Sequence, residues 1–311
     1  MEDYPRDLLE FEAHFSTEQA CREYLMKLRW PEGFVCPQCQ GRQAWTSQRN
    51  LLICTECQHQ ASLTAGTIFQ DTRKPLTLWF RAIWWVTSQK NGASALGVQR
   101  ILGLRTYHTA WTWLHKLRRA MVRPGRDPLK GRVEVDETYI GGLEEGVRGR
   151  ETEKKALVIV AAEEDGNGMG RVRLRRIANA SRSSLHGFIR DSIALGSVVH
   201  TDGWEGYSGL EGYEHQATVL RGREESADKL LPRVHRVVSL LKRWLLGTHQ
   251  GAISPEHLDY YLDEFAFRFN RRRSRSRGKL FYRLLQQAVA IGPTPYKALI
   301  KHLKPGPDRR G

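Results

Sequence analysis

The stretch Arg132-Val-Glu-Val-Asp-Glu-Thr-Tyr-Ile-Gly-Gly142 alternates apolar and polar residues, which predicts a β-strand carrying Asp136. A second β-branched run, Ser197-Val-Val-His-Thr-Asp-Gly-Trp-Glu-Gly-Tyr207, ends at Asp202, where a glycine lets the chain turn away. Two aspartates on neighbouring strands are the minimum for holding divalent cations through oxygen, so we predict a shared metal site. Glu137 should point to the opposite side of its strand. The plainer alternatives are a strand-end cap for Asp136 and an Asp-Gly turn for Asp202.

The segments after Asp136 predict the rest of a sheet. They are apolar runs at 155–162 and 170–177, a helical pattern at 181–193, the Asp202 strand, a short run at 216–220 and a helix from 232. This order predicts an α/β fold, a mixed sheet with flanking helices of the ribonuclease H-like kind.

The helix predicted from Pro232 to Leu246 places His235, Ser239 and Lys242 on one polar face. That face lies beside an apolar stripe formed by Val234, Val238, Leu241 and Leu245. If the stripe packs on the sheet, the helix carries His235 toward the two aspartates. The alternative is that His235 and Lys242 are solvated side chains without a metal.

Four of the five cysteines form two C-x2-C pairs, Cys36-Pro-Gln-Cys39 and Cys54-Thr-Glu-Cys57, separated by fourteen residues. This spacing is typical of a zinc ribbon, in which four thiolates bind one structural Zn²⁺ and residues 42–53 form a hairpin. The alternatives are a redox dithiol or a chance pairing of cysteines. Four sulfur ligands leave no open position for a catalytic zinc. Cys21 lies in an apolar-periodic segment and should be a small core residue.

Residues 93–121 have the pattern of a helix-turn-helix, with a short helix, a glycine turn and a longer helix from Tyr107. Arg105 and Tyr107, near the start of the longer helix, are the candidates for contact with DNA. Further positive charges would face phosphate: Lys116, Arg118, Arg119 and Arg123. Any small three-helix core gives the same pattern.

The chain of 311 residues carries 49 Lys and Arg against 34 Asp and Glu, a formal charge of +15. This balance favours a polyanionic partner, nucleic acid first, over a merely basic surface. No run approaches the roughly 18 apolar residues of a membrane span, and the acidic start lacks a signal-peptide layout. We therefore expect a cytoplasmic protein with no membrane partner.

Taken together, these motifs resemble the transposases of the IS1595 (ISXO2-like) family, in the DDE superfamily. Beyond the zinc ribbon and the helical segment, the resemblance rests on the blocks Val135-Asp-Glu-Thr-Tyr-Ile-Gly-Gly142, Thr201-Asp-Gly203, Ser239-Leu-Leu-Lys-Arg243, Gly247-Thr-His249 and His257-Leu-Asp-Tyr-Tyr-Leu-Asp-Glu-Phe-Ala-Phe-Arg-Phe-Asn-Arg-Arg272. The last block is the most specific. Its apolar stripe fits a helix core, and Arg271 and Arg272 are candidate phosphate contacts.

The resemblance implies a catalytic domain in which acidic residues hold two Mg²⁺ or Mn²⁺ ions, with a lysine seven residues past the third ligand. Asp136, Asp202 and Lys242 match these positions. The third position falls on His235, where such transposases usually have Glu or Asn. Three other residues stay open as third ligand: Glu205, Glu224 and Glu225.

We expect an N-terminal helix and zinc ribbon at 1–70, a helix-turn-helix module at 71–128, a ribonuclease H-like catalytic domain at 129–290 and a basic tail at 291–311. The function this implies is a DNA transposase that cuts element ends and joins them to target DNA, acting as a homo-oligomer on the terminal inverted repeats. One alternative is a catalytically silent, sequence-specific DNA-binding protein derived from a transposase. Another is a nuclease that nicks without joining.

Overall fold

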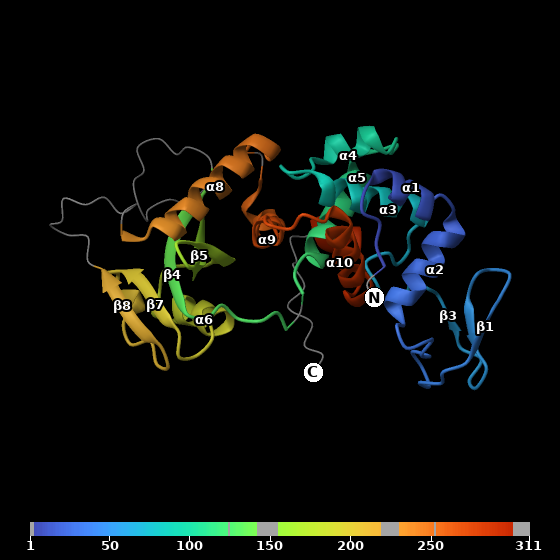
Figure 1. The fold of residues 1–311 in the computed structure, drawn as a ribbon, viewed down its shortest axis with the longest axis horizontal. Helices are drawn as coiled ribbons and strands as arrows, with labels where there is room; N and C mark the ends of the chain where they lie inside the picture. The colour runs from blue at the N-terminus through green and yellow to red at the C-terminus, as the bar shows by residue number, and fades with distance from the viewer. Residues whose placement is uncertain (1–2, 124, 142–154, 219–229, 252, 301–311) are drawn as a thin grey trace. The chain divides into compact units, whose positions relative to one another are not determined.

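The computed structural model describes residues 3–123, 125–141, 155–218, 230–251 and 253–300 (Figure 1). Contacts divide the chain into two packing units. The helical unit comprises residues 1–123 and 274–311, and the sheet unit comprises residues 124–273.

The helical unit consists of packed helices and a small ribbon of strands at its edge (Figure 1). Its helices are α1 (Leu8–His14), α2 (Glu18–Arg29), α3 (Leu76–Ser88), α4 (Ala95–Ile101), α5 (Tyr107–Ala120), α10 (Arg277–Ala290) and α11 (Tyr296–Ile300). Most begin at a side chain that accepts a backbone N–H of the first turn, as Thr17 does for α2 and Thr106 does for α5. The predicted pair of helices at 93–121 is confirmed as α4 and α5, joined by Gly103 at a φ of 60°.

Aromatic side chains form the core of this unit. Phe281 of α10 is fully buried, and its ring centroid lies 5.3 Å from Phe11, 5.5 Å from Phe15, 5.7 Å from Phe80 and 5.7 Å from Trp84. These rings belong to α1 and α3 or flank α1, and α10 also packs against α2 and α5. The sequence, by contrast, assigned residues 274–290 to the catalytic domain. The packing units and the predicted functional modules thus have different limits.

The ribbon is a three-stranded antiparallel sheet of β1 (Ala44–Thr46), β2 (Leu52–Cys54) and β3 (Gln60–Ala61). Trp45 pairs with Ile53, so the predicted hairpin is confirmed. Cys21, in α2, is fully buried, as its apolar surroundings predicted.

The sheet unit is built on five strands in the order β6-β5-β4-β7-β8. Their bounds are β4 (Arg132–Ile140), β5 (Ala156–Asp165), β6 (Gly168–Ile177), β7 (Val198–Asp202) and β8 (Glu214–Thr218). β4, β5 and β6 are antiparallel neighbours, whereas β7 runs parallel to both β4 and β8. The mixed, ribonuclease H-like sheet predicted from the sequence is confirmed.

Helices cover both faces of this sheet (Figure 1). On one face, Val133 and Val135 of β4 pack with α6 (Arg182–Ser192). On the other face, Val158 and Val160 of β5 pack with α8 (Pro232–His249) and α9 (Leu258–Asn270). Because side chains alternate along a strand, the even-numbered residues of β4 face α8.

Among the described residues, no helix has both the length and the apolar character needed to span a bilayer.

Replacing Phe281 with alanine should reduce the stability of the helical unit by about 3–5 kcal/mol, because the change removes a buried ring from the aromatic core. The measurement is chemical denaturation together with hydrogen exchange of the α3 amides, with the exposed Lys279→Ala on the same helix as control. Unchanged protection of α3 in Phe281→Ala would contradict this placement of α10.

Candidate metal centres and DNA interface

Parallel pairing of β4 with β7 places Asp136 beside Asp202. The paired residues run from Arg132 and Val198 to Glu134 and His200, and the same register continued by two residues brings Asp136 and Asp202 near each other. Laterally paired residues of parallel strands share a face, so both aspartates lie on the side of the sheet that carries α8. The strand ends predicted to hold metal are thus adjacent in the fold.

The electrostatics of this pair fit a cation. Burial, followed by the negative charges of Glu137 and Asp202, raises the pKa of Asp136 to about 7. The side chain of Asp136 is only 17% exposed, so water screens its charge poorly. A bound divalent ion would offset this concentration of negative charge, and carboxylate oxygens are the ligands that Mg²⁺ and Mn²⁺ prefer.

His235 lies in the first turn of α8 and faces Asp136. Its Nε2 is 3.9 Å from Oδ2 of Asp136, and its side chain is 26% exposed. The i+7 residue, Lys242, lies two turns further along the same helix. Glu137 points to the other face, as predicted, and its Oε2 accepts a 2.6 Å hydrogen bond from the hydroxyl of buried Tyr207.

The other candidates for a third ligand differ in position. Glu205 is exposed in the short 3-10 helix Glu205–Tyr207 that follows Asp202. Glu224 and Glu225 lie outside the described residues.

Asp136, Asp202 and His235 form a more open arrangement than the cysteines do. Among the described residues, only the four cysteines bring three or more ligand atoms all within 4.8 Å of one another. Ligands of a two-ion site spread further than ligands of one ion, because the two ions themselves lie roughly 3.5–4 Å apart.

Lys242 borders a pocket of about 480 Å³ in the sheet unit. Lys155 lines the same pocket, whose other walls include Ile140, Leu245 and Leu258. Partial burial and the neighbouring Lys155 lower the pKa of Lys242. Two ammonium groups beside one pocket attract anions, which suits a contact with a DNA phosphate.

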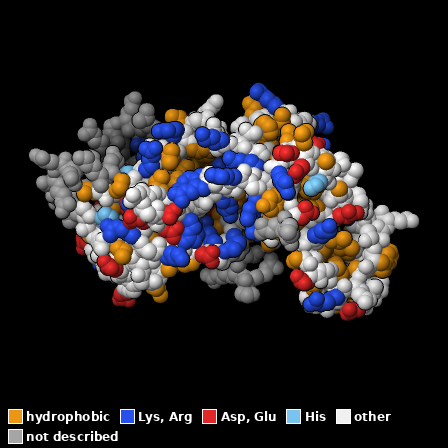
Figure 2. Space-filling model, viewed as in Figure 1, with side chains coloured by type: hydrophobic (Ala, Val, Ile, Leu, Met, Phe, Trp, Pro, Cys, Tyr) orange, Lys and Arg blue, Asp and Glu red, His pale blue; other side chains and the backbone are white. Residues whose placement is uncertain are grey.

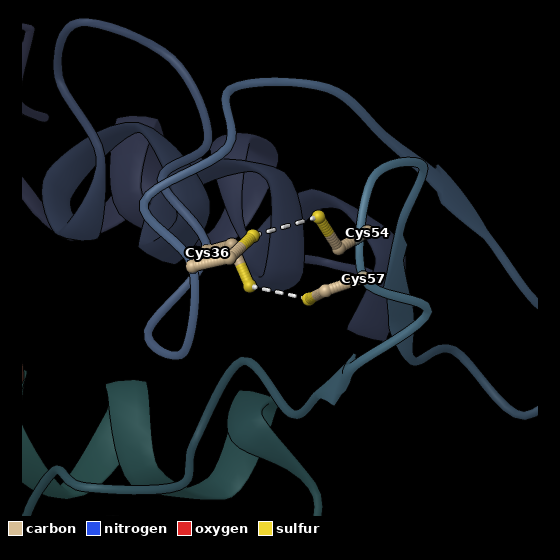
Figure 3. Close-up of side chains that lie close together, drawn as sticks. Cys36, Cys54 and Cys57 are labelled. Atoms are coloured by element: carbon tan, nitrogen blue, oxygen red, sulfur yellow. Dashed lines mark hydrogen bonds between the residues drawn. The ribbon is translucent and has the colours of Figure 1, made fainter.

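The zinc site is assembled in the helical unit, where the two cysteine pairs face each other (Figure 3). The Sγ atoms of Cys36 and Cys57 are 3.6 Å apart, and those of Cys39 and Cys54 are also 3.6 Å apart. Four sulfurs at about 2.3 Å from a tetrahedral zinc would lie about 3.8 Å from one another. The ribbon therefore holds its thiols at a spacing that fits one structural zinc.

The N-terminal part of α5 is open to solvent. Arg105 is exposed, and Tyr107 is 47% exposed. Lys116 and Arg119 are less available to DNA. Lys116 is partly buried, which lowers its pKa, and Arg119 donates a hydrogen bond to the Thr294 hydroxyl. Arg118 is only 2% exposed, so its expected place on the phosphate-facing side is wrong.

In the sheet unit, Lys and Arg side chains gather on the face that carries α8 (Figure 2). Arg236, Lys242 and Arg243 are the exposed cations of this helix. Arg271 and Arg272, after α9, stack on Phe267 and Phe269 with guanidinium carbons 4.1 Å from each ring centre. Arg272 also donates to the carbonyl of Gly170, 3.1 Å away, so its role in binding phosphate stays a prediction.

Two family models match this chain. The ISXO2-like transposase domain matches residues 128–270, and the transposase zinc-ribbon domain matches residues 16–60. The chain belongs to the ISXO2-like (IS1595) transposase family. Among its relatives, an uncharacterized protein in transposable element ISH50 of Halobacterium salinarum is 27% identical over 277 residues, or 82% of this chain and 91% of that protein.

The two matched ranges contain every candidate ligand that the structure describes. The cysteines fall within the zinc ribbon, and the Asp136, Asp202 and His235 cluster falls within the transposase domain. Family membership therefore supports structural zinc and DNA binding by a transposase-derived protein.

Sequence reasoning missed one part of the site. Glu134 of β4 is 2% exposed and forms an ion pair with Arg233 of α8, with Oε1 and Nη1 3.0 Å apart. Its alternation with Asp136 shows that both lie on one face of the strand, but the sequence does not reveal which residue meets it there.

The ribbon should hold one zinc per chain, and the double variant Cys39→Ser, Cys57→Ser should lose it, because one ligand of each pair is removed. Elemental analysis of purified protein measures this, with Cys21→Ser as the control that keeps its zinc. Full zinc content in the double variant would show that the metal lies elsewhere.

Proposed function

We propose that this protein is a DDE-type transposase that cleaves insertion-sequence ends and joins them to target DNA with divalent metal ions. The observation that carries the proposal is the convergence of three side chains on one face of the sheet. Asp136 and Asp202 each lie two residues past the paired residues Glu134 and His200 of parallel strands, and His235 Nε2 lies 3.9 Å from Asp136 Oδ2. Family membership supports the same reaction class.

Each residue has a distinct role in this proposal. Asp136 and Asp202 would hold two Mg²⁺ or Mn²⁺ ions, and His235 would be the third ligand. Bound ions would activate the attacking water or 3′-hydroxyl and neutralise charge on the leaving oxygen. Lys242, at the pocket beside α8, would bind a DNA phosphate and orient the strand.

The partners follow from the same proposal. The exposed start of α5 would read the terminal inverted repeats, and the basic face of α8 would contact the DNA backbone. Two element ends must be cut and joined together, so we propose a homo-oligomer as the active form. The +15 charge supports binding to both element and target DNA.

A second candidate is a silent DNA-binding protein, and the observation that favours it is the imidazole of His235 at the third position. A neutral ligand gives the site one negative charge fewer than a third carboxylate would. Joining of a pre-cut element end separates the candidates: a transposase joins, a nuclease only nicks, and a silent protein does neither.

In a strand-transfer assay on a pre-cut end, Asp136→Ala and Asp202→Ala should abolish joining, because each removes a carboxylate ligand. His235→Ala should reduce joining severely, and the parent should work better with Mn²⁺ than with Mg²⁺, since Mn²⁺ accepts nitrogen ligands more readily. His235→Glu should retain or improve joining with Mg²⁺. Undiminished joining by His235→Ala would place the third ligand elsewhere, with Glu224 and Glu225 next to be tested.

Arg105→Ala should weaken binding to element ends more than binding to random DNA, because a base contact carries sequence information and a phosphate contact does not. Fluorescence anisotropy at several salt concentrations measures both affinities. Arg123→Ala, just outside α5, is the matched loss of one charge. Equal weakening for both DNAs would make Arg105 a phosphate contact only.

A further inference from the structure

Glu134 connects the strand that carries Asp136 with the helix that carries His235. Oε2 of Glu134 accepts hydrogen bonds from the backbone N–H groups of Arg233, at 2.7 Å, and Val234, at 2.9 Å. Oε1 lies 3.0 Å from Nη1 of Arg233. All three bonds go to the first turn of α8.

The first turn of α8 lacks a cap from its own sequence. Leu231 at the N-cap position offers no side-chain hydrogen bond, and Pro232 has no N–H. Glu134 therefore does from β4 what Ser, Thr or Asp usually do from the preceding residue. Its negative charge also lies at the positive end of the helix dipole.

This cap adjoins the metal candidates along both elements. Along β4, Glu134 precedes Asp136 by two residues, about 6.6 Å, on the same face. Along α8, the capped N–H of Val234 immediately precedes His235. A contact so near both ligands fixes how the helix turn is rotated and how far it stands from the strand.

Arg233 strengthens the connection from the helix side. Its Nη2 lies 2.7 Å from Oε1 of Glu164 on β5, and its Nε donates to the carbonyl of Gly168 at 3.1 Å. Glu164 thus balances the same guanidinium as Glu134 but caps no N–H of α8 in these bonds. Comparing variants of Glu134 and Glu164 therefore separates the effect of losing a negative charge near Arg233 from the effect of losing the cap of α8.

We propose that Glu134 is a positioning residue, which holds the first turn of α8 against β4 so that His235 faces Asp136 and can complete the metal site. The proposal rests on the function proposed above. Glu134 itself is 2% exposed and bound to α8, so it acts through His235 and not as a metal ligand.

The test is the affinity of the full chain for Mn²⁺, measured from the electron paramagnetic resonance signal of the free ion. The double variant Asp136→Ala, Asp202→Ala identifies the binding that belongs to this site. Glu134→Ala should raise the dissociation constant roughly 10- to 100-fold, the range found for residues that orient metal ligands. Glu164→Gln removes the same charge from Arg233 and should change it less than about threefold, within the usual spread of such effects.

Coupling to His235 supplies the second readout. In a His235→Ala background, Glu134→Ala should have little further effect on Mn²⁺ affinity, because its target is already gone. Glu134→Gln keeps an acceptor for the helix N–H groups, so it should fall between the parent and Glu134→Ala. It also tests the idea if Glu134→Ala fails to fold. Hydrogen exchange at Val234 and His235 should quicken in the same order.

Three results would overturn the proposal while leaving the proposed function standing: parent-like Mn²⁺ affinity in Glu134→Ala and Glu134→Gln, equal weakening by Glu134→Gln and Glu164→Gln, or an undiminished effect of Glu134→Ala without His235. A parent protein whose Mn²⁺ binding is unaffected by loss of both Asp136 and Asp202 would overturn the proposed function and this inference together.

Discussion

The parallel pairing of β4 with β7 is the constraint on which the candidate site depends. The pairing aligns Glu134 with His200, and Asp136 and Asp202 each follow two residues later, on the same face. A shift of one residue would send Asp202 to the face covered by α6. The buried valines of these two strands, Val133, Val135 and Val199, oppose such a shift because they belong to the core on that face.

A sheet built this way concentrates negative charge under a helix. Asp136 has a pKa near 7 because burial and the neighbouring carboxylates of Glu137 and Asp202 disfavour its charged form. The fold stabilises the nearby Glu134 by pairing it with Arg233, and Tyr207 donates to Glu137. Asp136 instead faces His235. Glu134 and Glu137 are thus held by structural partners, whereas Asp136 lies beside another candidate ligand, and this difference distinguishes it from the structural acids on the same strand.

The sequence predicted what depends on local pattern. Alternation identified β4, the C-x2-C pairs identified the ribbon, and the polar stripe of α8 placed His235 toward Asp136. Features that depend on distant chain segments could not be read in the same way. The burial of Arg118 and the packing of Phe281 with the N-terminal helices are set by residues far away in the sequence. The cap that Glu134 provides spans about a hundred residues and has no local signature.

The measurement that tests the account most directly is a crystal structure of the protein soaked with Mn²⁺, in which anomalous scattering locates the ions. The account predicts manganese between Asp136 and Asp202, with a ring nitrogen of His235 at bonding distance, roughly 2 Å. Manganese bound away from the two aspartates, or held by them with His235 turned away, would contradict it.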